Sequence, residues 1–496
     1  MKSQPVIIIG IDGLDPSLVF RWKSELKNLA QIIDQGAGGD LASVFPPDSI
    51  PAWASIFTGK NPTDHGIIQY INYLSSKDLS VDFSGLAGNT FWDMAGDKGK
   101  KVCVINPFIA YPAWKVNGVM VSGPAFIKGP VLSYPPEIIK DYNIPPVLGG
   151  IAGFPSKSQL RDFIKQTRES IRSLKDIGLQ LFAEDTYDLR FLTFFELDRI
   201  QHFFWRYHDE EDPTYPGKNP HQETIKDFYK IFDDIIGEFQ QMAESCGAAL
   251  MILSDHGHGR RCTKVLNINE ILRRAGFLDA KGAGKKGFSP LVLIEKLKTG
   301  LLNFIYEHDL EDLLYKITPY IPYRKELKKS SFLISADDNL ASADPDFGGT
   351  NPFGGIKINS RLINDKNLNY EEIRSKIIAE LLSADIFAGD GKSVFKWVLR
   401  RDDVYSGDRL DLYPDILYEL DGEFGTNWSL YGALTGVSTT HKKLSGGHKK
   451  EGALYIANVN RPVKRNNPSL LHIAPTVLNL LGVEPDIVYE KESLLA

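Results

Sequence analysis

Apolar positions in this chain alternate between short β-branched runs and longer segments with helical spacing. The first run, Val6 to Ile11, is almost continuously apolar, as is typical of a strand buried on both faces of a parallel sheet. Similar runs predict strands at 102–106, 118–122, 189–195, 248–253, 354–359 and 415–420. Helical spacing predicts helices at 26–33, 156–185, 223–245, 370–384 and 470–482. This alternation predicts an α/β fold with a mostly parallel central sheet and helices on both faces.

One lysine-rich segment, which begins at Lys281, interrupts this rhythm of strands and helices. A chain of 496 residues is also longer than a single hydrophobic core usually supports. We therefore expect residues 281–345 to form a helical insertion or cap. The catalytic core would then consist of residues 1–280 and 346–496.

Composition and charge narrow the class of protein. The net charge of −6 and the absence of a basic stripe give no reason to expect a nucleic-acid partner. The three cysteines, Cys103, Cys246 and Cys262, lie far apart, which argues against a disulfide framework or a thiolate metal site. No segment has the pattern of a signal peptide or the length of a membrane span, so we expect a cytoplasmic protein without membrane contact.

Polar residues with ligand chemistry follow several predicted strands or lie in glycine-rich corners. Because the carboxyl ends of parallel strands meet at one edge of a sheet, these side chains are expected to converge. A helical turn would also place residues four apart on one face. The residues are Asp12, Asp198, His202, Asp255, His256 and His448. Each also has a structural interpretation, such as a turn aspartate or a satisfied core pair.

A serine between prolines completes this set. Pro46 and Pro47 before Ser49, and Pro51 after it, stiffen the turn that leads into a predicted short helix. Ser49 is therefore either an ordinary helix cap or a displayed nucleophile. Carboxylates, imidazoles and a hydroxyl together suit two divalent ions, with zinc expected and manganese or iron as alternatives. Two such ions would support phosphoryl displacement by the serine.

The order of the motifs resembles the alkaline phosphatase superfamily, and more narrowly its type I phosphodiesterase/nucleotide pyrophosphatase branch with the related predicted phosphohydrolases and phosphomutases. The resemblance runs almost end to end, outside the lysine-rich segment. The matching stretches are 9–13, 46–53, 58–62, 65–66, 117–123, 198–202, 254–257, 447–448 and 473–478.

The resemblance implies a role for each candidate residue. One metal would be held by Asp198, His202 and His448. The other would be held by Asp12, Asp255 and His256 together with Ser49, which would form a covalent phospho-enzyme. Sulfatases of the superfamily carry arginine at the position of Trp53, so sulfatase activity is not expected.

The sequence thus predicts a two-metal phosphodiesterase acting on a small phosphoester, with nucleotides as one possible class. A phosphomonoesterase or phosphomutase of the same fold is the first alternative. A binding protein without catalysis is the second. The remaining histidines near these motifs, among them His258, are expected to lie outside the ligand set, and the oligomeric state is not predicted.

Overall fold

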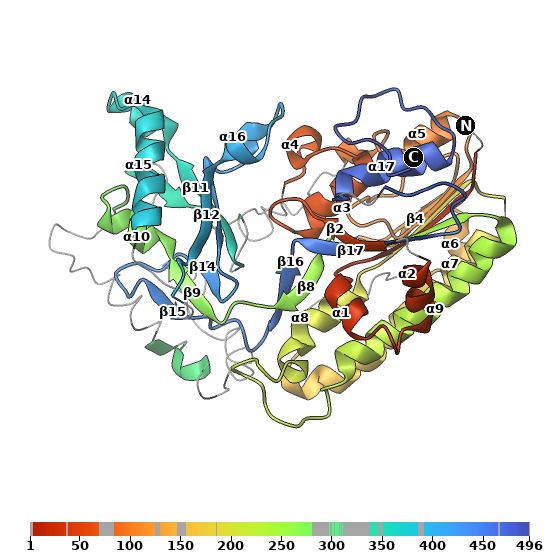
Figure 1. Ribbon diagram of the computed structural model, residues 1–496, viewed down its shortest axis with the longest axis horizontal. Coiled ribbons are helices and arrows are strands. Elements are labelled where there is room, and N and C mark those ends of the chain that lie inside the picture. The colour runs from red at the N-terminus through yellow and green to blue at the C-terminus, as the bar shows by residue number, and fades with distance from the viewer. Residues whose placement is uncertain are drawn as a thin grey trace. The chain divides into compact units, whose positions relative to one another are not determined.

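The computed structural model describes most of the chain in two compact units. The units comprise Met1–Gly259 with His448–Ala496, and Arg260–Gly447. We refer to them as unit 1 and unit 2 (Figure 1). The described residues are 3–35, 38–68, 84–124, 129–145, 155–184, 186–279, 297, 300–301, 303–306, 308, 310, 338–344, 347, 351–384, 391–464 and 467–495.

An eight-stranded sheet forms the centre of unit 1. In sheet order its strands are β2 (Gly38–Ala42), β17 (Glu451–Ala457), β7 (Ala249–Leu253), β1 (Val6–Ile11), β6 (Leu189–Phe194), β3 (Val102–Ile105), β4 (Gly118–Ser122) and β5 (Leu132–Tyr134). The five strands from β7 to β4 are mutually parallel, whereas β17 and β5 run antiparallel to their neighbours. The expected α/β fold with a mostly parallel sheet is therefore confirmed.

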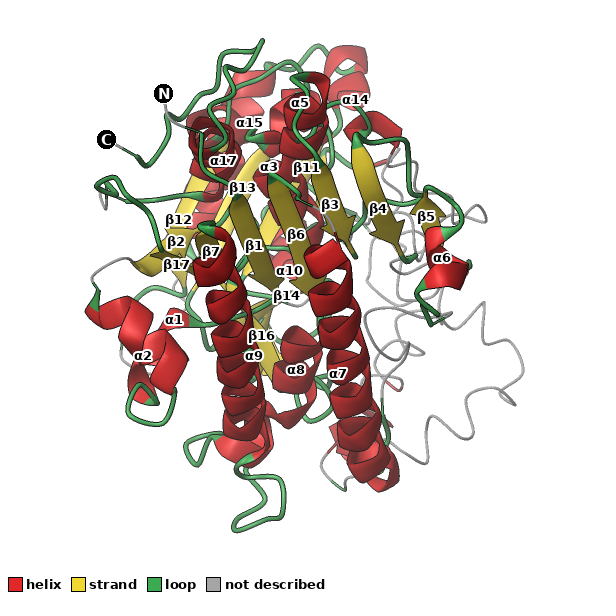
Figure 2. Cartoon of the chain, turned by 90° about the vertical axis from the view of Figure 1, so that its right-hand side faces the viewer, coloured by secondary structure: helices red, strands yellow, loops and turns green. Residues whose placement is uncertain are grey.

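Helices cover both faces of this sheet. The helices of unit 1 are α1 (Pro16–Arg21), α2 (Lys27–Asp34), α3 (Ser49–Thr58), α4 (Pro62–His65), α5 (Phe91–Asp97), α6 (Ile138–Asp141), α7 (Leu160–Glu184), α8 (Glu196–His208), α9 (Thr224–Cys246) and α17 (Ile473–Leu480). Helices α3, α5 and α17 pack together in one layer, and the long helices α7 and α9 cross the opposite face (Figure 2).

The core under α3, α5 and α17 is rich in aromatic rings. Phe57 packs against Trp53, Trp92 and Phe191, with ring centroids 4.8 to 5.8 Å apart. All four side chains are buried in one cluster with the residues of β1 that face this layer. This packing fixes α3, and hence the residue at its start, against the centre of the sheet.

The order of the central strands determines where ligands converge. Strand β1 lies between β7 and β6, and all three run in the same direction. Asp12, Asp255 and Asp198 follow these three neighbouring strands at their carboxyl ends. Two short strands, β8 (Gly257–Arg260) and β16 (Gly446–Lys449), pair with each other.

The described residues of unit 2 form two smaller sheets. The first has the antiparallel order β10 (Ala341–Ala343), β11 (Phe353–Ile358), β13 (Ile416–Leu420) and β12 (Phe395–Arg400). The second contains β14 (Phe424–Asn427), β9 (Lys264–Asn267) and β15 (Thr435–Val437). Among the residues that the structure describes, the helices of unit 2 with defined bounds are α10 (Ile268–Arg274), α14 (Ser360–Asp365), α15 (Tyr370–Ser383) and α16 (Arg401–Val404).

The predicted strands at 354–359 and 415–420 exist, but they pair with each other as β11 and β13 rather than joining the central sheet. The compact units also begin and end at residues other than the predicted boundaries at 280 and 345. Most of the predicted insertion, residues 281–345, lies outside the described residues, so its helical character stays a prediction. Among the described helices, none is both long and apolar enough to span a membrane.

Candidate active site

Ser49 is the first residue of α3, and it is not the residue that caps this helix. Asp48 is the N-cap, because its carboxylate accepts a hydrogen bond of 3.2 Å from the Ile50 amide. Such a cap satisfies one of the free amides at a helix start. The Ser49 hydroxyl therefore remains available, and its Oγ lies 3.1 Å from His256 Nε2 and 3.5 Å from Asp12 Oδ1.

A first group of candidate ligands surrounds this hydroxyl. Asp12, Asp255 and His256 are buried, and each offers a donor atom within 4.8 Å of the others. His256 Nε2 lies 3.3 Å from Asp255 Oδ2 and 3.6 Å from Asp12 Oδ1. We call these three residues, together with Ser49, the Asp12 group.

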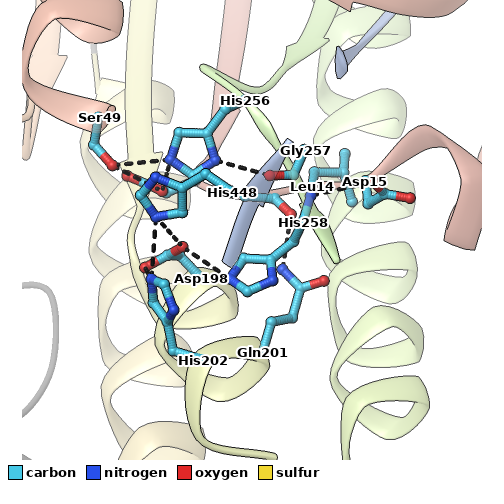
Figure 3. A network of polar contacts seen from close by, with 12 residues as sticks. Leu14, Asp15, Ser49, Asp198, Gln201, His202, His256, Gly257, His258 and His448 are labelled. Carbon is cyan, nitrogen blue, oxygen red and sulfur yellow. Dashed lines mark hydrogen bonds and ion pairs between the residues drawn. The ribbon is translucent and has the colours of Figure 1, made fainter. Parts of the chain in front are cut away.

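A second group lies beside the first. Asp198 and His202 occupy one turn of α8, with Asp198 Oδ2 at 3.3 Å from His202 Nε2. His448 on β16 brings its Nε2 to 3.1 Å from His202 Nε2. His258 on β8 also turns its ring toward Asp198 (Figure 3). We call these four residues the Asp198 group, and their donor atoms also lie within 4.8 Å of one another.

Hydrogen bonds to backbone carbonyls determine which ring nitrogen two of these histidines turn toward the other candidate ligands. The Nδ1 of His256 lies 3.0 Å from the Gly257 carbonyl oxygen, and the Nδ1 of His448 lies 2.8 Å from that of Pro47. A carbonyl only accepts, so each Nδ1 carries a proton and each ring turns its Nε2 into its group. This is the arrangement that commonly orients a metal-binding imidazole.

The electrostatics of the two groups differ. Burial raises the pKa of Asp12 well above its ordinary value, and Asp255 and Asp198 raise it further. Burial, with Asp198 next, raises the pKa of Asp255 to about 7. In the Asp198 group burial would also raise the pKa of Asp198, but His202, His258 and His448 outweigh it and hold the pKa well below its ordinary value.

The same surroundings shift the pKa values of the histidines. Burial lowers the pKa of His256 well below its ordinary value, so the ring is neutral and can donate a lone pair. Burial would also lower the pKa of His448, but the Asp198 carboxylate reverses the effect and raises it. The crowded carboxylates and the neutral imidazole of His256 favour a cation between them.

A buried hydrogen-bond network fixes α8 against the loop that carries Asp12. Gln201 Nε2 donates to the Gly13 carbonyl at 2.7 Å, and the Tyr229 hydroxyl donates to Gln201 Oε1 at 3.0 Å. The same hydroxyl accepts the Asp15 amide at 3.0 Å. Asp15 caps α1 by accepting a hydrogen bond from the Leu18 amide. These bonds hold the Asp198 turn close to β1.

The donor spacing fits metal ions. Four donors held tetrahedrally at about 2.0–2.2 Å from an ion lie roughly 3.3–3.6 Å from one another. Four pairs of donor atoms in the Asp12 group lie 3.1 to 3.6 Å apart. Four pairs in the Asp198 group lie 3.1 to 3.5 Å apart. Asp255 Oδ2 and Asp198 Oδ1 also have no hydrogen-bond partner among the described residues, as expected for oxygens reserved for a cation.

All seven predicted site residues therefore lie in these two groups, in the division that the resemblance implied. The sequence interpretation missed His258, because it treated the glycine-rich run after Asp255 as a turn. The signal was a second histidine two residues after the first, since extended backbone places alternate side chains on one face.

Comparisons with known proteins agree with this geometry. The family model described as type I phosphodiesterase / nucleotide pyrophosphatase matches residues 6–410. No curated protein sequence matches significantly. Among solved structures, phosphonoacetate hydrolase from Sinorhizobium meliloti 1021 in complex with phosphonoformate is 15% identical with a TM-score of 0.56, covering 97% of this chain and 96% of that one. At this identity the likeness establishes the fold.

A second solved structure has a lower TM-score. Human ectonucleotide pyrophosphatase / phosphodiesterase 5 is 11% identical with a TM-score of 0.49, covering 99% of this chain and 100% of that one. The family model spans most of the sequence, and the two candidate metal-binding groups lie at the carboxyl edge of the central sheet of unit 1. The chain therefore belongs to the type I phosphodiesterase / nucleotide pyrophosphatase family of the alkaline phosphatase superfamily.

Proposed function

We propose that this protein hydrolyses phosphoesters, with phosphodiesters as its preferred substrates, through a Ser49 phospho-enzyme at a two-metal site. One observation carries the proposal. The Ser49 Oγ lies within the Asp12 group, 3.1 Å from His256 Nε2 and 3.5 Å from Asp12 Oδ1, rather than capping its helix.

Residues of the chain itself determine where the phosphate group is bound and attacked. Ser49 stands at the N-terminus of the ten-residue helix α3, where the helix dipole favours an anionic phosphate group. The Asp12 group would hold one divalent ion and the Asp198 group the other, with zinc expected from the carboxylate and imidazole donors. When bound, these ions would lower the pKa of the Ser49 hydroxyl and neutralise charge on the attacking and leaving oxygens.

The reaction proceeds in two displacements. Ser49 Oγ forms a bond to phosphorus while the bond from phosphorus to one ester oxygen breaks, and that oxygen leaves with a proton as an alcohol. Water then attacks the phosphorus of the phosphodiester that now joins Ser49 to the remaining ester group, breaks its bond to Ser49 Oγ and gives that oxygen a proton. The second displacement releases a phosphomonoester and restores the serine hydroxyl.

A metal-supplemented comparison of two chromogenic substrates tests the substrate class. We expect turnover of bis-p-nitrophenyl phosphate to exceed that of p-nitrophenyl phosphate, and metal analysis to find about two divalent ions per chain. A reversed ranking with two ions would replace the diesterase with a monoesterase or phosphomutase. Protein that binds no ions and turns over neither ester would favour a binding protein.

Ser49→Ala tests the nucleophile. We expect turnover to fall about a thousandfold or more while two ions remain bound, since a nucleophile supplies an entire reaction step. Ser55→Ala is a matched control, because this buried serine lies on the same helix and its Oγ contacts His65 at 3.0 Å. Retained turnover in Ser49→Ala would remove Ser49 as the nucleophile.

A further inference from the structure

His258 is a buried imidazole whose surroundings do not satisfy it. Its side chain has no solvent exposure, and neither ring nitrogen has a hydrogen-bond partner among the described residues. Its Nε2 faces Asp198 Oδ1, which likewise has no hydrogen-bond partner in the described part of the chain. Buried polar atoms left unpaired are costly, so the facing pair of His258 Nε2 and Asp198 Oδ1 calls for a missing partner between them.

The position of the ring suits a direct metal contact better than a hydrogen bond. His258 Nε2 lies 3.4 Å from Asp198 Oδ1, beyond the usual N–H···O range of about 2.7–3.2 Å. The same separation is the edge of a tetrahedron of metal ligands. It matches the 3.5 Å between His448 Nε2 and Asp198 Oδ1 and the 3.3 Å between His202 Nε2 and Asp198 Oδ2.

Neighbouring rings hold the imidazole in this orientation. Trp205, which lies on α8, stacks on it with ring centroids 5.7 Å apart and an angle of 23° between the planes. His202 meets it edge to face at 4.7 Å. Because Trp205 and His202 share α8 with Asp198, the helix that supplies two ligands also fixes the plane of His258.

The two groups consequently offer different numbers of protein donors. The Asp198 group has four carboxylate and imidazole residues. The Asp12 group has three, and its fourth donor is the Ser49 hydroxyl, which is also the proposed nucleophile. An ion in the Asp198 group is held without help from the reacting serine.

We infer that His258 is a direct fourth protein ligand of the metal in the Asp198 group, so that this ion is bound more tightly than the ion in the Asp12 group. The inference rests on the two-metal site of the proposed function. The ion in the Asp198 group would then dissociate slowly, whereas the ion in the Asp12 group would exchange more readily.

The most direct test counts the ligating histidines. In protein loaded with Co²⁺, the ring N–H of each ligating imidazole gives a hyperfine-shifted, exchangeable proton signal. We expect four such signals, from His202, His256, His258 and His448, and three in His258→Gln. The control His208→Asn removes a partly buried histidine of α8 whose Nδ1 contacts the Gln222 carbonyl, and it should retain all four.

Three signals in wild-type protein that binds two Co²⁺ ions would overturn the inference and leave the proposed function standing. Failure of wild-type protein to bind Co²⁺, Zn²⁺ or Mn²⁺ would overturn both. The wild-type count decides the question even if His258→Gln does not fold.

Chelator competition with Zn²⁺ provides a second measurement. Wild-type protein should release its two ions in separate phases. His258→Gln should weaken the tighter phase by about tenfold or more, by analogy with the 10–100-fold effects of residues that only support a ligand. Ser49→Ala should weaken only the other phase, and equal release of both ions from wild-type protein would contradict the inference.

Discussion

Trp53 Nε1 donates a hydrogen bond of 3.0 Å to Asp12 Oδ2, and this bond turns the other carboxylate oxygen toward Ser49 and His256. Trp53 is fully buried in the aromatic core beneath α3. The tryptophan that separates this chain from the sulfatases therefore orients a candidate metal ligand from within the hydrophobic core.

Trp53→Phe should weaken metal binding at the Asp12 group while largely keeping the packing. The ring still contacts Phe57 and Phe191, but the Asp12 carboxylate loses its donor. Loss of such a partner typically costs 10–100-fold in metal affinity. Chelator competition should find the effect in one of the two ions. Trp92→Phe is the control, because Trp92 is equally buried and its Nε1 has no hydrogen-bond partner among the described residues. Equal effects of the two variants would show that packing, not orientation, is responsible.

Gly10→Ala should press against the Trp53 indole that donates to Asp12. A Cβ atom at Gly10 would lie 2.6 Å from Trp53 Cη2 and 3.1 Å from a Thr193 methyl group. The indole is fully buried and cannot move freely, so we expect overpacking to cost about 1–3 kcal/mol in the free energy of unfolding. Urea denaturation measures this cost. Gly85→Ala, at a position where an added Cβ meets nothing within 4 Å, should be nearly neutral, and a neutral Gly10→Ala would contradict the packing described.

Metal binding should depend on pH through Asp255. Burial raises the pKa of this carboxyl to about 7 in the folded protein, above its unfolded value, so folding without metal takes up a proton there. Ionisation of Asp255 therefore destabilises the metal-free protein as the pH rises toward 7, whereas a bound ion requires the ionised form.

We accordingly expect the rise in unfolding temperature on adding Zn²⁺ to be larger at about pH 8 than at about pH 6. Thermal unfolding of chelator-treated and Zn²⁺-loaded protein measures it. Asp255→Asn cannot ionise and should lose much of this dependence. The same temperature rise at both pH values would count against a metal ligand with a raised pKa.

The local pattern of apolar and polar residues was sufficient to predict the part of the fold that carries the candidate site. The strand predicted at Val6 to Ile11 is β1 with the same bounds, because a strand buried on both faces is apolar throughout. Residues that follow such strands must meet at the carboxyl edge, which is why Asp12 and Asp255 could be placed together. The helical spacing of Asp198 and His202 likewise holds in α8.

What the sequence pattern could not predict depends on partners distant in the chain. The strands at 354–359 and 415–420 were recognised, but their antiparallel pairing in unit 2 depends on which strand each one meets. His258 was missed because the glycine-rich segment around it forms the extended strand β8. This strand pairs with β16, which lies almost 200 residues later in the chain. The local sequence of Ser49 allowed either a cap or a nucleophile, and the structure gives the cap to Asp48.

The central claim is that Ser49 carries the phosphoryl group during turnover. Rapid acid quenching of the reaction with bis-p-nitrophenyl phosphate, followed by mass spectrometry of the peptide that contains Ser49, tests it most directly. We predict a nitrophenyl phosphoryl adduct on Ser49 that forms within the first turnover and is absent from Ser49→Ala. Full turnover with no adduct on Ser49 at any quench time, together with undiminished activity of Ser49→Ala, would contradict the account.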